Sequence, residues 1–139
     1  FMTTRSSGFS LIELLVVVAI LGIISSIGLV AYNGYIAGTK MKSAKNVMQQ
    51  ISLAQTEEYS NSGQYHTQGD TCTPGADTSD EIETVLFGGG DQISEEIGYE
   101  MCIMISGTNS YTIQALKGGI EGECSIELSQ NGIWREENC

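Results

Sequence analysis

The side chain with the clearest chemical role is Glu13, the only carboxylate before Glu57. It lies five residues after Gly8, at the start of an apolar run that reaches Ala31 without another charge. A carboxylate deep in a bilayer costs about 2.5–3.5 kcal/mol, so Glu13 needs a cation, a proton or access to the interface. Cleavage after Gly8 would supply a cation, because the new α-amino group on Phe9 is largely protonated at neutral pH. Within one chain the two groups lie one helical turn apart, whereas in a staggered stack of subunits the amine of one chain would meet Glu13 of its neighbour.

The residues before the apolar run have the composition of a short leader. Residues 2–8 are polar and contain Arg5. An ordinary secretory signal is cut after its apolar stretch, next to small residues. Here the processing-like junction between Gly8 and Phe9 precedes the stretch, so cleavage would leave the apolar segment on the protein.

This N-terminal region resembles the class III signal and first helix of type IV pilins and their pseudopilin relatives. The resemblance is close over residues 2–35, where Gly-Phe-Ser-Leu-Ile-Glu (8–13) is followed by Leu-Leu-Val-Val-Val-Ala-Ile-Leu-Gly-Ile (14–23). It continues more loosely through Tyr32, Tyr35 and residues 54–59 to a C-terminal cysteine pair. The resemblance implies cleavage by prepilin peptidase between Gly8 and Phe9, N-methylation of Phe9, and a requirement for Glu13 in assembly.

The function implied is that of a structural subunit of a type IV pilus, a helical homopolymer used in adhesion, twitching motility or DNA uptake. The implied partners are further copies of the chain, prepilin peptidase, the inner-membrane assembly machinery, and the lipid bilayer before assembly. The implied location is the inner membrane for the precursor and the surface of a Gram-negative bacterium for the filament. Two alternatives stay open: a type II secretion pseudopilin or minor pilin, and a periplasmic binding domain held by an uncleaved signal anchor.

The apolar run predicts a helix that is long enough to cross a bilayer, since residues 11–31 would measure about 30 Å. Beyond it, apolar side chains recur every three or four residues and indicate one buried stripe: Ala37, Met41, Ala44, Met48, Ile51, and Gln55 or Ala54. Both patterns together predict a single helix from about Ser10 to Ser60, ended by Gly63. The expected organisation is a leader (1–8), a transmembrane or filament-core helix (9–35) and a globular head (36–139).

The head is predicted to be an antiparallel sheet of about four strands packed on the second half of the helix. Strand patterns cover residues 99–106, 111–117, 124–128 and 133–136, with turn residues between them. Residues 63–97 are irregular apart from a short helix at about 79–87, with Ser79 as its cap. The predicted fold class is α+β, stapled by disulfides.

The formal net charge is −11, and every carboxylate except Glu13 lies beyond residue 46, where Lys117 and Arg135 are the only cations. Direct binding of DNA or RNA is not expected, because phosphate neutralisation needs clustered Lys and Arg. Nothing in the sequence resembles a nucleophile–base pair, so neither an enzyme nor a cofactor is predicted. Calcium ligation is not favoured, because the acidic residues of the loops lack the spacing of a calcium loop. His66 is interpreted as a solvated loop residue, and Trp134 as a packing residue of the sheet.

Four cysteines fall in the acidic part of the chain: Cys72, Cys102, Cys124 and Cys139. They lack zinc-ligand spacing. An even count in a small exported domain predicts two disulfides, with three possible connectivities. Cys124–Cys139 is favoured because it closes a loop of hairpin size and because the resemblance places a terminal disulfide loop there. Cys72–Cys102 is then the second expected pair.

One departure from the family pattern concerns the end of the apolar run. Many members have a proline where this sequence has Val30, and that proline is associated with unwinding of the helix in filaments. Gly22 and Gly28 each lower helix propensity by about 1 kcal/mol relative to Ala. If the helix unwinds in a filament, the unwound segment is therefore expected between these two glycines.

Overall fold

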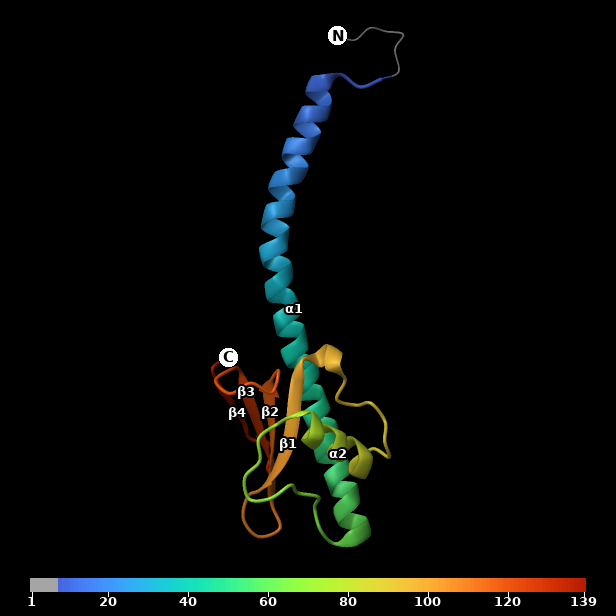
Figure 1. Ribbon diagram of the computed structural model, residues 1–139, viewed down its shortest axis with the longest axis vertical. Coiled ribbons are helices and arrows are strands. Elements are labelled where there is room, and N and C mark those ends of the chain that lie inside the picture. The colour runs from blue at the N-terminus through green and yellow to red at the C-terminus, as the bar shows by residue number, and fades with distance from the viewer. Residues whose placement is uncertain (1–7) are drawn as a thin grey trace. The chain divides into compact units, whose positions relative to one another are not determined.

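The computed structural model describes residues 8–139 (Figure 1). The expected leader therefore lies outside the described residues, except for Gly8. Two units meet at a boundary between Gly38 and Thr39; we refer to residues 39–139 as the head. The elements follow in this order: α1 (Leu11–Ser62), α2 (Ala76–Leu86), the 3₁₀ helix η1 (Glu95–Ile97), β1 (Tyr99–Ile105), β2 (Tyr111–Lys117), β3 (Ser125–Ser129) and β4 (Trp134–Glu137). The predicted α+β class, with a long first helix and four strands, is confirmed.

Helix α1 ends at a glycine, as expected from the sequence. Gly63 follows the last helical residue with φ +80°, a left-handed conformation that costs glycine little. Its backbone nitrogen donates to the carbonyl oxygen of Tyr59 at 2.8 Å, which satisfies one carbonyl of the last turn.

The buried stripe of α1 lies within the head and is shorter than predicted. Its members are spaced by one, three or four residues: Ala44, Val47, Met48, Ile51 and Gln55. Ala37 is exposed and precedes the head, so its assignment to the stripe was wrong. Met41 is only partly buried, and Val47 extends the stripe on one side.

The four strands form one antiparallel sheet in the order β1-β2-β3-β4. The registers pair Tyr99 with Lys117, Ile113 with Leu128, and Leu128 with Trp134. Burial alternates along β2 and β3, as expected where one face of a sheet is covered. The inward residues join the α1 stripe in one core cluster, and Figure 1 shows the second half of α1 running along the sheet, with α2 beside β1.

Helix α2 begins earlier than predicted, and Ser79 does not cap it. The cap position is held by Gly75, whose backbone nitrogen donates to Oγ1 of Thr78 at 2.9 Å. Ser79 is buried one turn inside the helix, where its hydroxyl donates to Glu100 at 2.6 Å and accepts from the nitrogen of Met101 at 3.0 Å. The hydroxyl therefore holds α2 against β1 instead of closing its own helix.

Buried and half-buried polar side chains fix the irregular segments. The amide of Gln55 exchanges two hydrogen bonds with the backbone of His66, at 2.6 and 2.8 Å. The amide oxygen of Gln68 accepts from the nitrogen of Ile103, which ties the same segment to β1. Glu83 is buried in α2 and accepts from the nitrogen of Ile93 at 3.0 Å. Each bond satisfies a backbone group that the loops would otherwise leave unpaired.

Two disulfides close the head. Cys72–Cys102 joins the irregular segment to β1, and Cys124–Cys139 joins the residue before β3 to the second residue after β4. Both pairs were expected: Cys124–Cys139 from loop size and the resemblance, and Cys72–Cys102 as the pair that then remains. In the chain-entropy account, each bridge stabilises the head by about 2–4 kcal/mol through the unfolded state.

Candidate functional site

The N-terminal end of α1 is built around a reciprocal pair of hydrogen bonds between Ser10 and Glu13. The backbone nitrogen of Ser10 donates to Oε2 of Glu13 at 3.2 Å. The backbone nitrogen of Glu13 donates to Oγ of Ser10, also at 3.2 Å. This arrangement is a capping box, and it satisfies two amide groups that a helix terminus would otherwise leave unpaired. The charge of Glu13 marks this residue in the sequence, but the box was not predicted, although Ser-x-x-Glu before an apolar run is its signature.

The expected cleavage point lies just outside this box. Gly8 and Phe9 precede the helix and are exposed, with Phe9 77% accessible to solvent. The peptide bond between them is therefore outside regular secondary structure, where a peptidase needs its substrate to be. Arg5 and the other leader residues before Gly8 lie outside the part of the chain that the structure describes.

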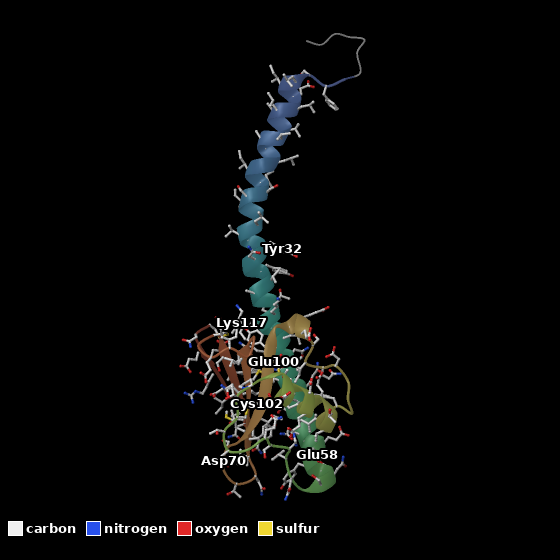
Figure 2. All side chains as sticks on the ribbon, in the orientation of Figure 1. Tyr32, Glu58, Asp70, Glu100, Cys102 and Lys117 are labelled. Carbon is white, nitrogen blue, oxygen red and sulfur yellow. A yellow bond between two sulfur atoms is a disulfide. The ribbon has the colours of Figure 1, made fainter. Side chains whose placement is uncertain are left out.

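The apolar half of α1 is exposed on all of its sides. Every residue from Leu11 to Tyr35 is exposed, and Figure 2 shows side chains projecting all around this part of the helix. Among the described residues, α1 is the one helix that is long and apolar enough to cross a membrane. A surface of this kind is unstable in water, so it requires either lipid or other apolar helices around it.

The glycines of this segment leave space beside the helix. A Cβ atom built on Gly22, Gly28, Gly34 or Gly38 would meet nothing within 4 Å. Nothing within the described chain therefore requires glycine at these positions, and α1 is helical through all four of them. The spacing of Gly34 and Gly38 is one at which two helices can approach closely.

The residues considered for metal binding do not come together. Among residues 8–139, no group of three His, Cys, Asp or Glu side chains is arranged to hold a metal ion. His66 is not solvated as predicted: its side chain is 15% exposed, and Nε2 lies 3.2 Å from Oε1 of Glu81. The burial follows from the two bonds with Gln55, which hold the His66 backbone against α1.

Trp134 packs on the core from the edge strand β4, as expected. The ammonium group of Lys45 lies 5.6 Å from the centre of its ring and 2.6 Å from Oε1 of Glu136. The ring also lines a shallow groove between α1 and the β3–β4 turn, together with Gln49, Ser52, Leu53, Leu128 and Gly132.

Comparisons with known proteins find one family model and several fimbrial proteins. The family model described as the prokaryotic N-terminal methylation motif matches residues 3–29. A fimbrial protein of Neisseria meningitidis serogroup B is 38% identical over 82 residues, which are 59% of this chain and 47% of that protein. The type IV major fimbrial protein FimA of Dichelobacter nodosus is 27% identical over 127 residues, 91% of this chain and 69% of that protein.

A shorter match is to a further fimbrial protein. The fimbrial protein EcpC of Eikenella corrodens is 45% identical over 56 residues, which are 40% of this chain and 37% of that protein. The chain thus spans about half the length of the first of these relatives and a smaller share of EcpC. No solved structure matches the chain.

Proposed function

We propose that the chain is a type IV pilin, a subunit of a type IV pilus that polymerises through the apolar half of α1; the methylation motif over residues 3–29 and the similarity to fimbrial proteins support this proposal. Proteins of this family are structural subunits and not enzymes. The observation that carries the proposal is the methylation motif at the start of an apolar helix that is exposed on all sides and contains a single carboxylate, Glu13.

The proposed precursor is held in the inner membrane by α1 and cut by prepilin peptidase between Gly8 and Phe9. Cleavage replaces a neutral amide by a positive amine on Phe9, which the same peptidase then methylates. Exposure of both residues supports this step, since the peptidase must reach the bond.

The proposed assembly step pairs the Phe9 amine of an incoming subunit with Glu13 of its neighbour. Within the apolar surroundings of packed helices an unpaired carboxylate is costly, so the pair favours one register of the incoming helix. An uncut chain has an amide and a polar leader at this place. Cleavage therefore acts as the switch that permits polymerisation.

In the proposed filament the first half of α1 forms the core, and the acidic head faces solvent at the cell surface. The head carries its own stabilising contacts, including both disulfides, and needs no partner to bury its core. The proposed partners are further copies of the chain, prepilin peptidase and the inner-membrane assembly machinery. Adhesion, motility and DNA uptake would be properties of the assembled filament.

The test is the intact mass of the protein in filaments sheared from cells, before and after reduction. We expect a chain that begins at methylated Phe9 and gains two hydrogens for each of its two disulfides on reduction. A chain that keeps residues 2–8 in filaments would contradict the amine–Glu13 mechanism. Cleaved protein that stays in the cell envelope of piliated cells would instead indicate a pseudopilin, and uncleaved protein there a membrane anchor.

A further inference from the structure

The capping box involves the same carboxylate that the proposed function uses for assembly. Its two bonds join only Ser10 and Glu13, both of which lie beyond the Gly8–Phe9 bond. Cleavage of that bond leaves the amide of Ser10 an amide and its hydroxyl untouched. The box therefore survives processing, and the mature chain begins one residue before it.

The bond from Ser10 to Oε2 turns the Glu13 side chain back toward the N-terminal end of α1. The carboxylate is thus held within the first turn, next to the position where cleavage creates the amine. Within the described chain, Oε1 of the same carboxylate has no hydrogen-bond partner, so one oxygen is fixed and the other is open. The positive end of the helix dipole favours a carboxylate at this place.

We infer that Ser10 is a positioning residue for assembly. Its hydroxyl fixes the first turn by accepting from the Glu13 nitrogen, and that turn brings the Ser10 backbone nitrogen to Oε2 of Glu13, which leaves the other carboxylate oxygen for the amine of the neighbouring subunit. The inference rests on the proposed function. A free glutamate side chain loses rotamer entropy when it is ordered. Because the box orders Glu13 before the subunits meet, much of that cost is removed from the assembly step.

Two roles of Glu13 must be separated, since the same side chain caps its own helix and carries the charge. Glutamine at this position completes a capping box as glutamate does. Glu13→Gln therefore keeps the box and removes the charge. Ser10→Ala keeps the charge and the backbone nitrogen that donates to Oε2, but it removes the hydroxyl that accepts from the Glu13 nitrogen and so opens half of the box. Ser10→Thr, which keeps the charge and the hydroxyl, is the matched control.

The experiment compares the three full-length variants with the wild type in cells. The measured quantity is the amount of pilin recovered in sheared filaments, divided by the amount of pilin that is inserted in the membrane and cleaved. Intact mass shows whether the pilin is cleaved. We expect Ser10→Ala to lower the normalised yield several-fold and Ser10→Thr to leave it unchanged. Amide hydrogen exchange of the full chain in micelles should show faster exchange at Glu13 in Ser10→Ala alone. A merely structural cap would speed exchange without changing the normalised yield.

The outcomes distinguish this inference from the proposed function. Wild-type filament yield in Ser10→Ala, together with loss of filaments in Glu13→Gln, would overturn the positioning role and leave the charge mechanism standing. Retention of the leader in Ser10→Ala would also overturn it, because Ser10 would then act on cleavage. Wild-type yield in Glu13→Gln would overturn both.

Discussion

The two halves of α1 have the same backbone conformation and opposite surroundings. From Leu11 to Tyr35 the side chains are mostly apolar and all exposed, whereas from Ala44 to Gln55 a stripe of the helix is buried in the core of the head. The first half contributes its apolar area to no core of its own chain, and the second half obtains its stability from the sheet. A helix can therefore be stable in one region through contacts that the chain makes itself, and in the other only through a bilayer or further copies.

The two regions also differ in how they use charge. The apolar half contains one carboxylate, already hydrogen-bonded within its own helix turn. The head carries all of the other carboxylates of the chain, mostly at its surface. A single charge in apolar surroundings can determine the register of an interaction, whereas surface charges mainly keep the head solvated.

The largest difference between the two halves of α1 is expected when one lysine is introduced into each half and membrane insertion is compared. Leu21 and Leu53 are both exposed leucines of the same helix, at 57% and 73%. Lysine at the centre of a membrane helix costs about 2.5–3.5 kcal/mol, whereas lysine on the surface of the head costs almost nothing. We therefore expect Leu21→Lys to prevent membrane insertion, measured by carbonate extraction of cell envelopes. Leu53→Lys is the matched control, and equal insertion of both variants would contradict the assignment of the apolar half.

The next effect concerns the buried stripe. Ile51 is fully buried and Leu53, two residues later, is mostly exposed. We expect Ile51→Ala to lower the free energy of unfolding of the head by about 2–5 kcal/mol, because it removes buried methyl groups and leaves a cavity. Leu53→Ala should change it by no more than about 0.5 kcal/mol. Urea unfolding of the full chain in micelles, followed by fluorescence of the single tryptophan, Trp134, measures both.

Much of the difference between the exposed half of α1 and the half packed on the sheet could be predicted from the sequence, because periodic patterns of apolar residues reflect local surroundings. The alternation in residues 111–117 gives β2 with its bounds unchanged, and the stripe through Ala44, Met48 and Ile51 gives the buried face of α1. The features that were not predicted are hydrogen bonds made by side chains. Ser79 was read as a local cap, but its hydroxyl bonds to β1, more than twenty residues away. Long-range partners of this kind leave no periodic signal, whereas the Ser10–Glu13 box is local and could have been found.

The two disulfides should differ in the stability that they give the head. Their cysteines are separated by 30 residues in Cys72–Cys102 and by 15 in Cys124–Cys139. In the chain-entropy account a doubled loop adds about 0.6 kcal/mol to a contribution of roughly 3 kcal/mol. We expect urea unfolding to show a larger loss for the Cys72→Ala, Cys102→Ala double variant than for the Cys124→Ala, Cys139→Ala pair. The reverse order would show that native contacts near β4 outweigh loop entropy.

Two tyrosines make the stability of the head depend on alkaline pH. Burial, and secondarily the Glu136 carboxylate, raise the pKa of Tyr99. Burial also raises the pKa of Tyr111, and the hydrogen bond with Ser52 lowers it in part. The unfolded chain therefore ionises these phenols at lower pH than the folded chain does, so stability is complete below their ordinary pKa and falls as pH rises through the folded values.

Urea unfolding between neutral pH and the alkaline range of tyrosine ionisation tests this dependence. We expect Tyr99→Phe to lose less stability with rising pH than the wild type, because it removes one ionising group. Tyr59→Phe, at an exposed position of α1, is the control and should follow the wild type. An unchanged slope in Tyr99→Phe would mean that another group causes the alkaline loss.

The smallest effect expected is at the ion pair that joins α1 to the edge strand β4. Lys45 and Glu136 lie 2.6 Å apart, but their side chains are 34% and 39% exposed, so solvent screens the pair. Lys45 also faces the partly exposed ring of Trp134, and this contact adds about 0.5–1 kcal/mol that does not require the carboxylate. We therefore expect Lys45→Met to destabilise the head more than Glu136→Gln does, with each change about 1 kcal/mol or less. A double-mutant cycle measured by urea unfolding at low and high salt separates the ion pair from the cation–π contact, because only the coupling between Lys45 and Glu136 should fall as salt rises.

A coupling that does not respond to salt would mean that the two side chains act through packing. The edge strand would then depend on apolar contact with α1, as the buried stripe does.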